Sequence, residues 1–197
     1  MIDSVSIETI EDMLKHRNTS YKLFLMKYLI ENISKDKARF SFKELSCGIV
    51  AMAWSYYETN YERFTKTDRI YDLVQYVLSL NGDITIYSSY DDVFKFLIES
   101  ADKEIICRLR QMSMCAPYRL LLPFVKDFKL NNLTWDKQNK KIAELSKQYE
   151  MFYVINGKEI IISDKWLKYI CYNRILVCQR VDFLLKEAYE KRKSNLC

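Results

Sequence analysis

The chain has 197 residues, of which 49% are hydrophobic and 29% are charged, and it contains only three glycines and two prolines. This composition is typical of a globular protein and excludes intrinsic disorder. Most turns require glycine or proline, so their scarcity excludes a fold of many short strands and favours a mainly α, compact multi-helix fold. We expect one domain over residues 1–197, with any subdivision falling near residue 115 and sharing the same core.

The net charge is +5 overall, but it is unevenly distributed along the chain. Residues 1–100 contain 12 Lys/Arg and 15 Asp/Glu, whereas residues 101–197 contain 19 and 11, which gives net charges of −3 and +8. An anionic partner such as duplex DNA is therefore expected to bind the second half.

Neither a secretory signal nor a membrane span is expected. The N-terminus has Asp3 where a signal peptide has basic residues, and no stretch reaches the roughly 18 uncharged apolar residues of a membrane span. We therefore expect a cytoplasmic protein without membrane association. The six cysteines form no C-x-x-C pair, so they are interpreted as reduced, and no metal site or other cofactor is predicted.

Apolar residues recur at helical spacing along most of the chain, and Ser or Thr often marks the start of the pattern. Helices are predicted at residues 4–16, 20–33, 41–57, 67–80, 89–99, 102–113 and 134–149, with a short helical turn between the two prolines at 117–124. Ile84 to Tyr87 is interpreted as a short extended piece.

A β-hairpin is predicted near residues 152–162, because Asn156-Gly157 separates two apolar runs and accommodates the positive φ angles of a type I′ turn. A long helix is expected from Ser163 or Asp164 onward. Asn173 is the one polar residue in its apolar stripe, and we interpret it as a buried amide that hydrogen-bonds to neighbouring backbone.

No catalytic centre is predicted. The single histidine, His16, is interpreted as a helix-end residue, and three glycines cannot supply either G-x-G-x-x-G or a P-loop. Asp91-Asp92 is interpreted as an acidic pair at a helix start rather than as a metal site. An enzyme whose site assembles from distant residues stays open as an alternative.

The basic residues of the second half are the candidates for nucleic-acid contact. The 134–149 helix should turn Trp135 inward and its lysines outward. The candidates comprise these lysines, a cluster near the C-terminus, and an arginine between the prolines. The candidates are Arg119, Lys137, Lys140, Lys141, Lys147, Lys191, Arg192 and Lys193. The alternative is a solvated surface without a partner. Lys22 and Arg119 lie in apolar runs, where they extend to solvent, pair with buried acids or contact phosphate.

Several short motifs occur in a familiar order. They are Thr19-Ser20-Tyr21-Lys22, Ser41-Phe42-Lys43-Glu44-Leu45, Met52-Ala53-Trp54, Ala116-Pro117-Tyr118-Arg119, Pro123-Phe124, Trp166-Leu167-Lys168-Tyr169 and Asn173-Arg174-Ile175-Leu176. This order, which covers most of the chain, resembles the helical region that precedes the nuclease module in a group of bacterial HNH (His-Asn-His) endonuclease-domain proteins. In that family the module's histidines and asparagines hold the cation. The chain stops at Cys197, about where that module would begin, so the family's catalytic residues have no positions here.

The resemblance implies a non-catalytic accessory domain that engages duplex DNA or positions a separate nuclease chain, in a setting such as phage defence. The alternative is a protein-interaction or scaffold domain with no nucleic-acid role, which binds another protein or itself. The aromatic content of 14% favours that alternative, because Tyr and Trp often anchor interfaces.

Overall fold

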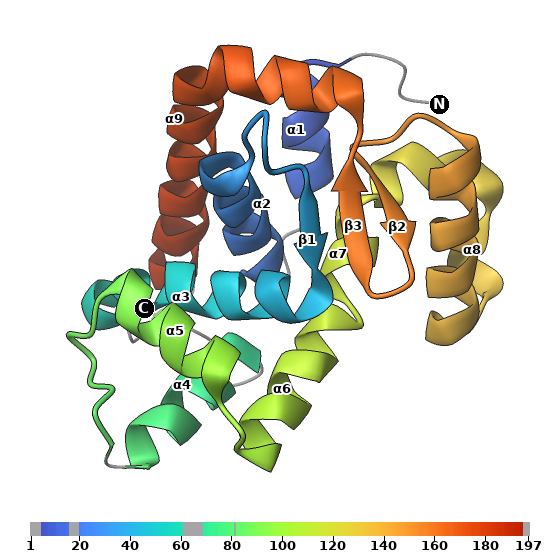
Figure 1. Ribbon diagram of the computed structural model, residues 1–197. Coiled ribbons are helices and arrows are strands. Elements are labelled where there is room, and N and C mark those ends of the chain that lie inside the picture. Colours follow the sequence, from blue (N-terminus) through green and yellow to red (C-terminus); the bar gives the residue numbers. More distant parts are fainter. Residues whose placement is uncertain (1–4, 16–19, 61–68, 81, 195–197) are drawn as a thin grey trace.

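The computed structural model describes residues 5–15, 20–60, 69–80 and 82–194, without the side chains of 58–60, 189 and 191–194. The protein is mainly α, as predicted (Figure 1). Its α-helices are α1 (Ile7–Leu14), α2 (Tyr21–Asn32), α3 (Phe42–Asn60), α4 (Arg69–Ser79), α5 (Tyr90–Glu99), α6 (Lys103–Ser113), α7 (Ala116–Leu120), α8 (Trp135–Gln148) and α9 (Asp164–Ser194). Two 3₁₀ helices, η2 (Leu122–Phe128) and η3 (Leu130–Asn132), join α7 to α8.

Helix α2 lies at the centre of the core, as its nearly all-round apolar surface predicts. Figure 1 shows α2 between α9, α3 and the sheet. Gly48 of α3 lies so close to the Tyr28 ring of α2 that an added Cβ would overlap it, so glycine is required where the two helices cross. Buried apolar residues from both sides of position 115, from Ile10 to Leu185, form one cluster.

Several helix starts follow the predicted capping residues. Ser41 Oγ accepts a hydrogen bond from the Glu44 backbone N–H at 3.1 Å, and Ser89 Oγ accepts one from Asp92 N–H at 3.2 Å. Ser20 occupies the N-cap position of α2, where the helix was predicted to start, but its side chain makes no capping hydrogen bond. Asn18, Thr19 and His16 lie outside the described residues.

The sheet is larger than the predicted hairpin. Strands β2 (Tyr153–Asn156) and β3 (Glu159–Ile162) form the hairpin, and β1 (Arg39–Ser41) joins it, giving the antiparallel order β1-β3-β2. With three residues, β1 is too short to show a two-residue periodicity in the sequence. Ile84 to Tyr87, predicted as extended, forms no strand.

The turn of the hairpin differs from the prediction. Asn156 pairs with Glu159, so the two turn residues are Gly157 and Lys158 rather than Asn156 and Gly157. Among the described turn residues only Gly157 has a positive φ, of 62°, which is the pattern of a type II′ turn and not of type I′.

Helix α9 was predicted as one continuous element, but it bends sharply at Asn173, whose φ and ψ of −109° and 20° are not helical. Figure 1 shows the first segment along the top of the molecule and the second running down its left side. The Asn173 side-chain amide donates to the Tyr169 carbonyl at 3.0 Å, so the predicted bond to neighbouring backbone is present. Asn173 is only half-buried, because it lies at the corner instead of inside a straight stripe.

None of the described helices combines the length and the apolar composition that crossing a membrane requires.

Candidate functional site

The eight predicted contact residues do not form one surface. Arg119 lies on α7, and four lysines lie on α8, whereas Lys191, Arg192 and Lys193 belong to the last turns of α9. Figure 1 places α8 on the opposite side of the molecule from the C-terminal end of α9. The side chains of the α9 group lie outside the description, so the site that can be built from contacts is the one shared by α7 and α8.

Arg119 is the centre of that site. Its side chain is buried, with 9% of the residue exposed, and its guanidinium carbon lies 3.9 Å from the centroid of the Trp135 ring. Nη1 donates to Gln138 Oε1 at 2.8 Å. Gln138 is itself held in place, because its Nε2 donates to the carbonyls of Leu130 and Leu133 at 2.9 and 3.2 Å. The guanidinium therefore lies against the first turn of α8.

Most of the hydrogen-bonding capacity of this guanidinium is unused. The Nε and Nη2 atoms of Arg119 are buried and have no acceptor among the described residues. Burial lowers the pKa of Arg119, and no carboxylate among the described residues counteracts this effect. A buried cation without a paired anion is costly to folding, so the geometry favours an external anion as its partner.

The start of α8 strengthens the attraction for an anion at the same place. Thr134 occupies the N-cap position, but its side chain makes no capping hydrogen bond, so it leaves first-turn N–H groups of α8 without a side-chain acceptor. The first turn of a helix also carries the positive end of the helix dipole. The exposed Asp136 in this turn offsets part of that field.

Trp135 lies against Arg119 at the start of α8. This residue was predicted to face inward, but 59% of it is exposed, because it lies at the helix end, where the core no longer covers it. Its ring lies over the guanidinium, whose Nε and Nη2 atoms are buried. The exposed indole also offers a flat surface on which a base or another ring can stack.

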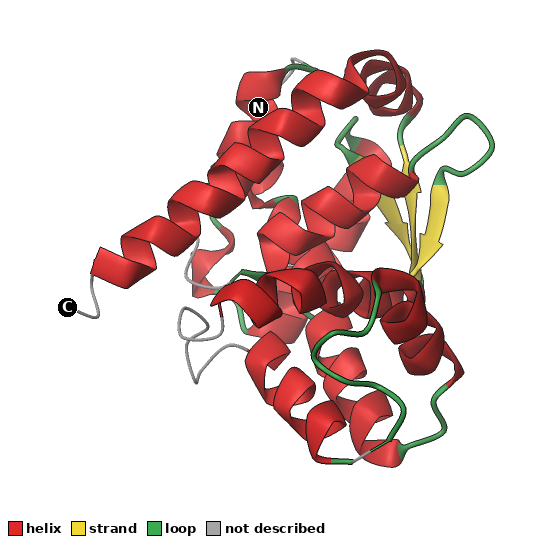
Figure 2. Cartoon of the chain, turned by 90° about the vertical axis from the view of Figure 1, so that its left-hand side faces the viewer, coloured by secondary structure: helices red, strands yellow, loops and turns green. Residues whose placement is uncertain are grey.

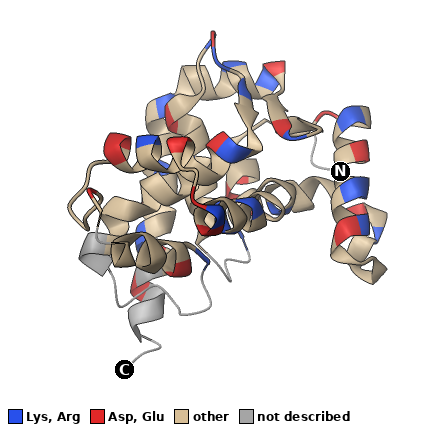
Figure 3. Ribbon diagram, turned by 60° about the horizontal axis from the view of Figure 1, so that its bottom comes forward, with Lys and Arg blue, Asp and Glu red and all other residues tan. Residues whose placement is uncertain are grey.

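The lysine face of α8 is partly neutralised. Lys137, Lys140 and Lys147 are exposed, as predicted. However, Lys141 is half-buried and pairs with Glu144 at 3.5 Å, and Glu144 lies one helical turn from Lys140 on the same face. Figure 3 shows this alternation as blue and red bands on the helix at its right-hand side.

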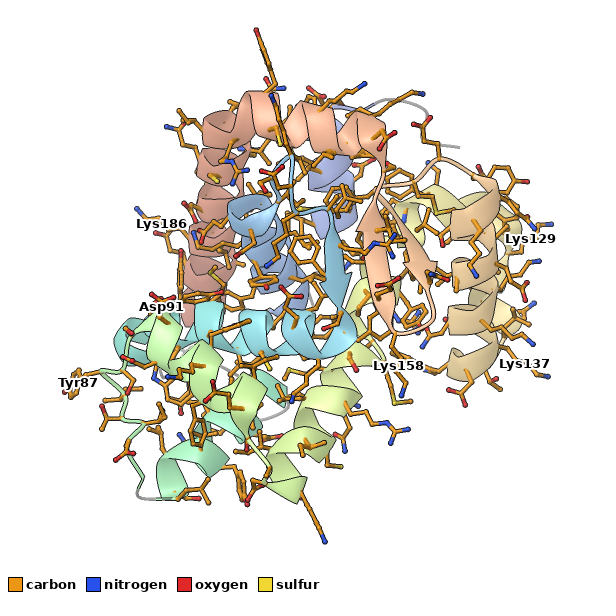
Figure 4. All side chains as sticks on the ribbon, viewed as in Figure 1. Tyr87, Asp91, Lys129, Lys137, Lys158 and Lys186 are labelled. Carbon is orange, nitrogen blue, oxygen red and sulfur yellow. The ribbon has the colours of Figure 1, made fainter. Side chains whose placement is uncertain are left out.

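Further lysines extend the basic surface beyond α8. Lys129, with a left-handed φ of 49°, is exposed at the end of η2, and Lys158 is exposed in the hairpin turn. Figure 4 shows Lys129, Lys137 and Lys158, from three different segments, pointing into solvent. Local helical periodicity could not reveal Lys129 or Lys158, because neither lies on a helix face.

Asp127 and Lys129 have an acid-x-Lys spacing, which one class of magnesium-dependent nucleases uses. Such chemistry needs several carboxylates around the metal. Both residues are exposed, and the described part of the chain contains no group of three or more His, Cys, Asp or Glu able to hold a metal ion. The spacing therefore does not amount to a metal centre in these residues.

Lys22, the second uncertain cation of the sequence, has a structural role. Its Nζ donates to the carbonyls of Lys15 and Met13 at 3.0 and 3.4 Å, at the C-terminal end of α1. Extension to solvent does not describe this side chain, since only 8% of the residue is exposed and its ammonium lies against backbone carbonyls.

Comparison of the chain with protein-family models, with curated proteins and with solved structures gave no match.

Proposed function

We propose that this protein is a non-catalytic accessory domain that engages the phosphate backbone of duplex DNA through Arg119 and the start of α8, and so positions a nuclease. The observation that carries the proposal is the buried Arg119 guanidinium, in which two donor atoms have no acceptor among the described residues and which lies under an exposed indole. The nuclease context rests on the resemblance to the region preceding HNH modules.

A phosphate group matches the unused donors at this site. Its oxygens can accept from the guanidinium fork and, at the same time, from N–H groups at a helix start. In the proposed complex Trp135 moves aside, a phosphate meets Nε and Nη2 of Arg119, and the indole stacks on the nucleic acid. Lys137 and Lys140 supply sequence-independent attraction at longer range.

The alternative function, a protein-interaction domain, is favoured by a separate observation on α9. Its exposed surface carries Tyr172, Ile175, Leu176 and Phe183, which are 91, 76, 53 and 55% exposed. Clustered apolar side chains on a surface mark interaction sites. The two functions involve opposite sides of the molecule and can be tested separately.

Binding of a fluorescent DNA duplex, followed by anisotropy at low and then rising salt, tests the proposed function. We expect binding to weaken as salt rises, because each phosphate contact releases counterions. Arg119→Met should weaken binding about tenfold or more, as expected for loss of a charge-assisted phosphate contact. Lys137→Glu combined with Lys140→Glu should both weaken binding and flatten its salt dependence.

Lys95→Glu is the matched control, since Lys95 is an exposed lysine on α5, away from α8. This variant should bind within about twofold of the wild type, because a single distant surface charge is largely screened. Absence of binding at low salt, or wild-type affinity in Arg119→Met, would overturn the proposal.

A further inference from the structure

Three buried side-chain atoms near the start of α8 lack hydrogen-bond partners among the described residues. Two of them, Nε and Nη2 of Arg119, are donors, and the third, Oδ1 of Asn139, is an acceptor. Nε and Nη2 lie along one edge of the guanidinium, so two oxygens of a single phosphate can accept from both. An acceptor such as Oδ1 instead needs an N–H or O–H group, which a phosphodiester does not have.

The orientation of the Asn139 side chain is fixed by its surroundings. Its Nδ2 donates to the Met114 carbonyl at 2.8 Å. Because that carbonyl can only accept, the amide nitrogen has to face it, and Oδ1 is the end of the side chain that stays without a partner. A buried acceptor without a donor is costly to folding. A ligand that satisfies the whole site therefore supplies a donor as well as acceptors.

The aromatic ring of the site lies on the same side of α8 as the unused acceptor. Trp135, Gln138 and Asn139 occupy positions i, i+3 and i+4 of the helix, which share one face. Gln138 accepts from Nη1 of Arg119 at 2.8 Å, and the Trp135 ring centroid lies 3.9 Å from the guanidinium carbon. Two donors, one acceptor and an exposed indole are thus gathered on the first two turns of α8.

We propose that this site takes a nucleotide whose base is unpaired, so that the protein prefers DNA with a single-stranded end to a continuous duplex. The inference rests on the proposed function, since it concerns the same Arg119 site. The phosphate of the nucleotide meets Nε and Nη2, its base stacks on the Trp135 indole, and an amino group of the base donates to Asn139 Oδ1. One ligand then satisfies all three buried atoms.

A continuous duplex does not offer these groups together. Its bases are stacked on one another, so between its ends it presents no open base face to an indole. Moving the indole off Arg119 gives up the contact between the ring and the cation, and a phosphate alone does not replace that contact. An unpaired base replaces it, because every base has a face on which an aromatic side chain can stack.

The exposed face of α9 takes no part in this site. Figure 2 views the molecule from the side of α9, with the second segment of this helix nearest the viewer, and Figure 1 shows α8 on the opposite side. Tyr172 of α9 is 91% exposed. It is therefore an exposed ring that a base bound at Trp135 does not reach, and it provides a matched control.

Anisotropy with a matched set of fluorescent DNAs tests the preference. All share one duplex, which is blunt or carries a short single-stranded end of deoxyadenosines, of the same purine without its amino group, or of abasic residues. The deoxyadenosine end should bind about fivefold or more tighter than the abasic end, which has the same phosphates, because stacking on an aromatic side chain contributes at least that factor. Removal of the amino group should weaken binding about threefold, as loss of one hydrogen bond does.

Variants locate the preference at the indole. Trp135→Ala should bind the deoxyadenosine and abasic ends within about twofold of each other, whereas Tyr172→Ala should keep the full preference. Tryptophan fluorescence gives a second measurement, because Trp54 and Trp166 are 0 and 1% exposed and Trp135 is 59% exposed. We expect the deoxyadenosine end to quench the fluorescence of the wild type more strongly than the abasic end does.

The outcomes separate this inference from the proposed function. Equal binding of the deoxyadenosine and abasic ends by the wild type, or an unchanged preference in Trp135→Ala, would overturn the inference and leave binding of the duplex backbone by Arg119 in place. Wild-type affinity of Arg119→Met for the blunt duplex, or no binding to any of these DNAs, would overturn the proposed function and this inference with it.

Discussion

Arg119 and Arg174 both reach the end of a helix from another element, but their surroundings differ. Arg174 of α9 donates from Nη1 to the carbonyls of Ile30 and Glu31 at 2.8 and 2.9 Å, and from Nη2 to the carbonyl of Ile33. These acceptors are at the C-terminal end of α2, where carbonyls lack helical partners. Arg119 lies at the N-terminal end of α8, where a cation faces the positive end of the dipole.

The two guanidinium groups differ in how far the protein satisfies their hydrogen bonds. At Arg174 the cation and the helix end satisfy each other, so this residue stabilises the junction between α2 and α9. At Arg119 the protein supplies one amide and one aromatic ring, and Nε and Nη2 lack an acceptor among the described residues. Substitution by methionine is therefore expected to lower the free energy of unfolding at Arg174 but not at Arg119.

The largest effect is expected for Arg174→Met. This change leaves the carbonyls at the end of α2 without donors and should lower the free energy of unfolding by about 2–4 kcal/mol. Chemical denaturation measures it. Arg180→Met on the same helix is the control, because Arg180 forms a half-exposed ion pair with Glu11, whose loss should cost about 1 kcal/mol or less. Equal losses in both variants would contradict a special role for Arg174.

An intermediate effect is expected for Lys22→Met. The ammonium of Lys22 donates to two carbonyls at the end of α1, so its loss should destabilise the protein by about 1–2 kcal/mol. This variant extends the comparison, because Lys22 resembles Arg174 in its carbonyl partners but resembles Arg119 in its burial. A loss below about 0.5 kcal/mol in denaturation curves would show that hydrogen bonds to helix-end carbonyls do not by themselves make a buried cation stabilising.

The smallest effect on stability is expected for Arg119→Met. Arg119 is a buried cation with no ion-pair partner among the described residues, so replacing it with an apolar side chain of similar length should change the free energy of unfolding by less than about 1 kcal/mol, and in the stabilising direction. Thermal denaturation without nucleic acid measures this change, and the anisotropy assay then measures binding by the same preparation. A large loss of stability would place Arg119 with Arg174 among the structural residues.

Much of the fold could be predicted from local patterns. Scarce glycine and proline, apolar spacing and capping residues such as Ser41 and Ser89 are short-range properties, and they located the helices and the hairpin near their observed positions. Strand β1 was missed because it forms only by pairing with β3, more than a hundred residues away. The bend at Asn173 was also missed, because a single polar residue in an apolar stripe does not by itself predict a break in a helix.

The candidate site was predicted only in part. Sequence reasoning selected Arg119 but left its role open, and it correctly placed Lys137 and Lys140 on the outer face of their helix. It assigned Trp135 to the interior and overlooked the pairing of the lysine face with Glu144. The contributions of Lys191, Arg192 and Lys193 stay predictions.

The helical class, most helix faces and the lack of a phosphate-binding glycine loop can be read from the amino-acid sequence, because they depend on composition and on neighbours a few residues apart. Contacts between distant segments are what bring Arg174 to carbonyls and leave Arg119 without an anion among the described residues. They also decide that α9 turns an apolar stripe outward, since exposure depends on which distant segments cover a helix face. Interactions between segments far apart in the chain leave no periodic signal in a single sequence.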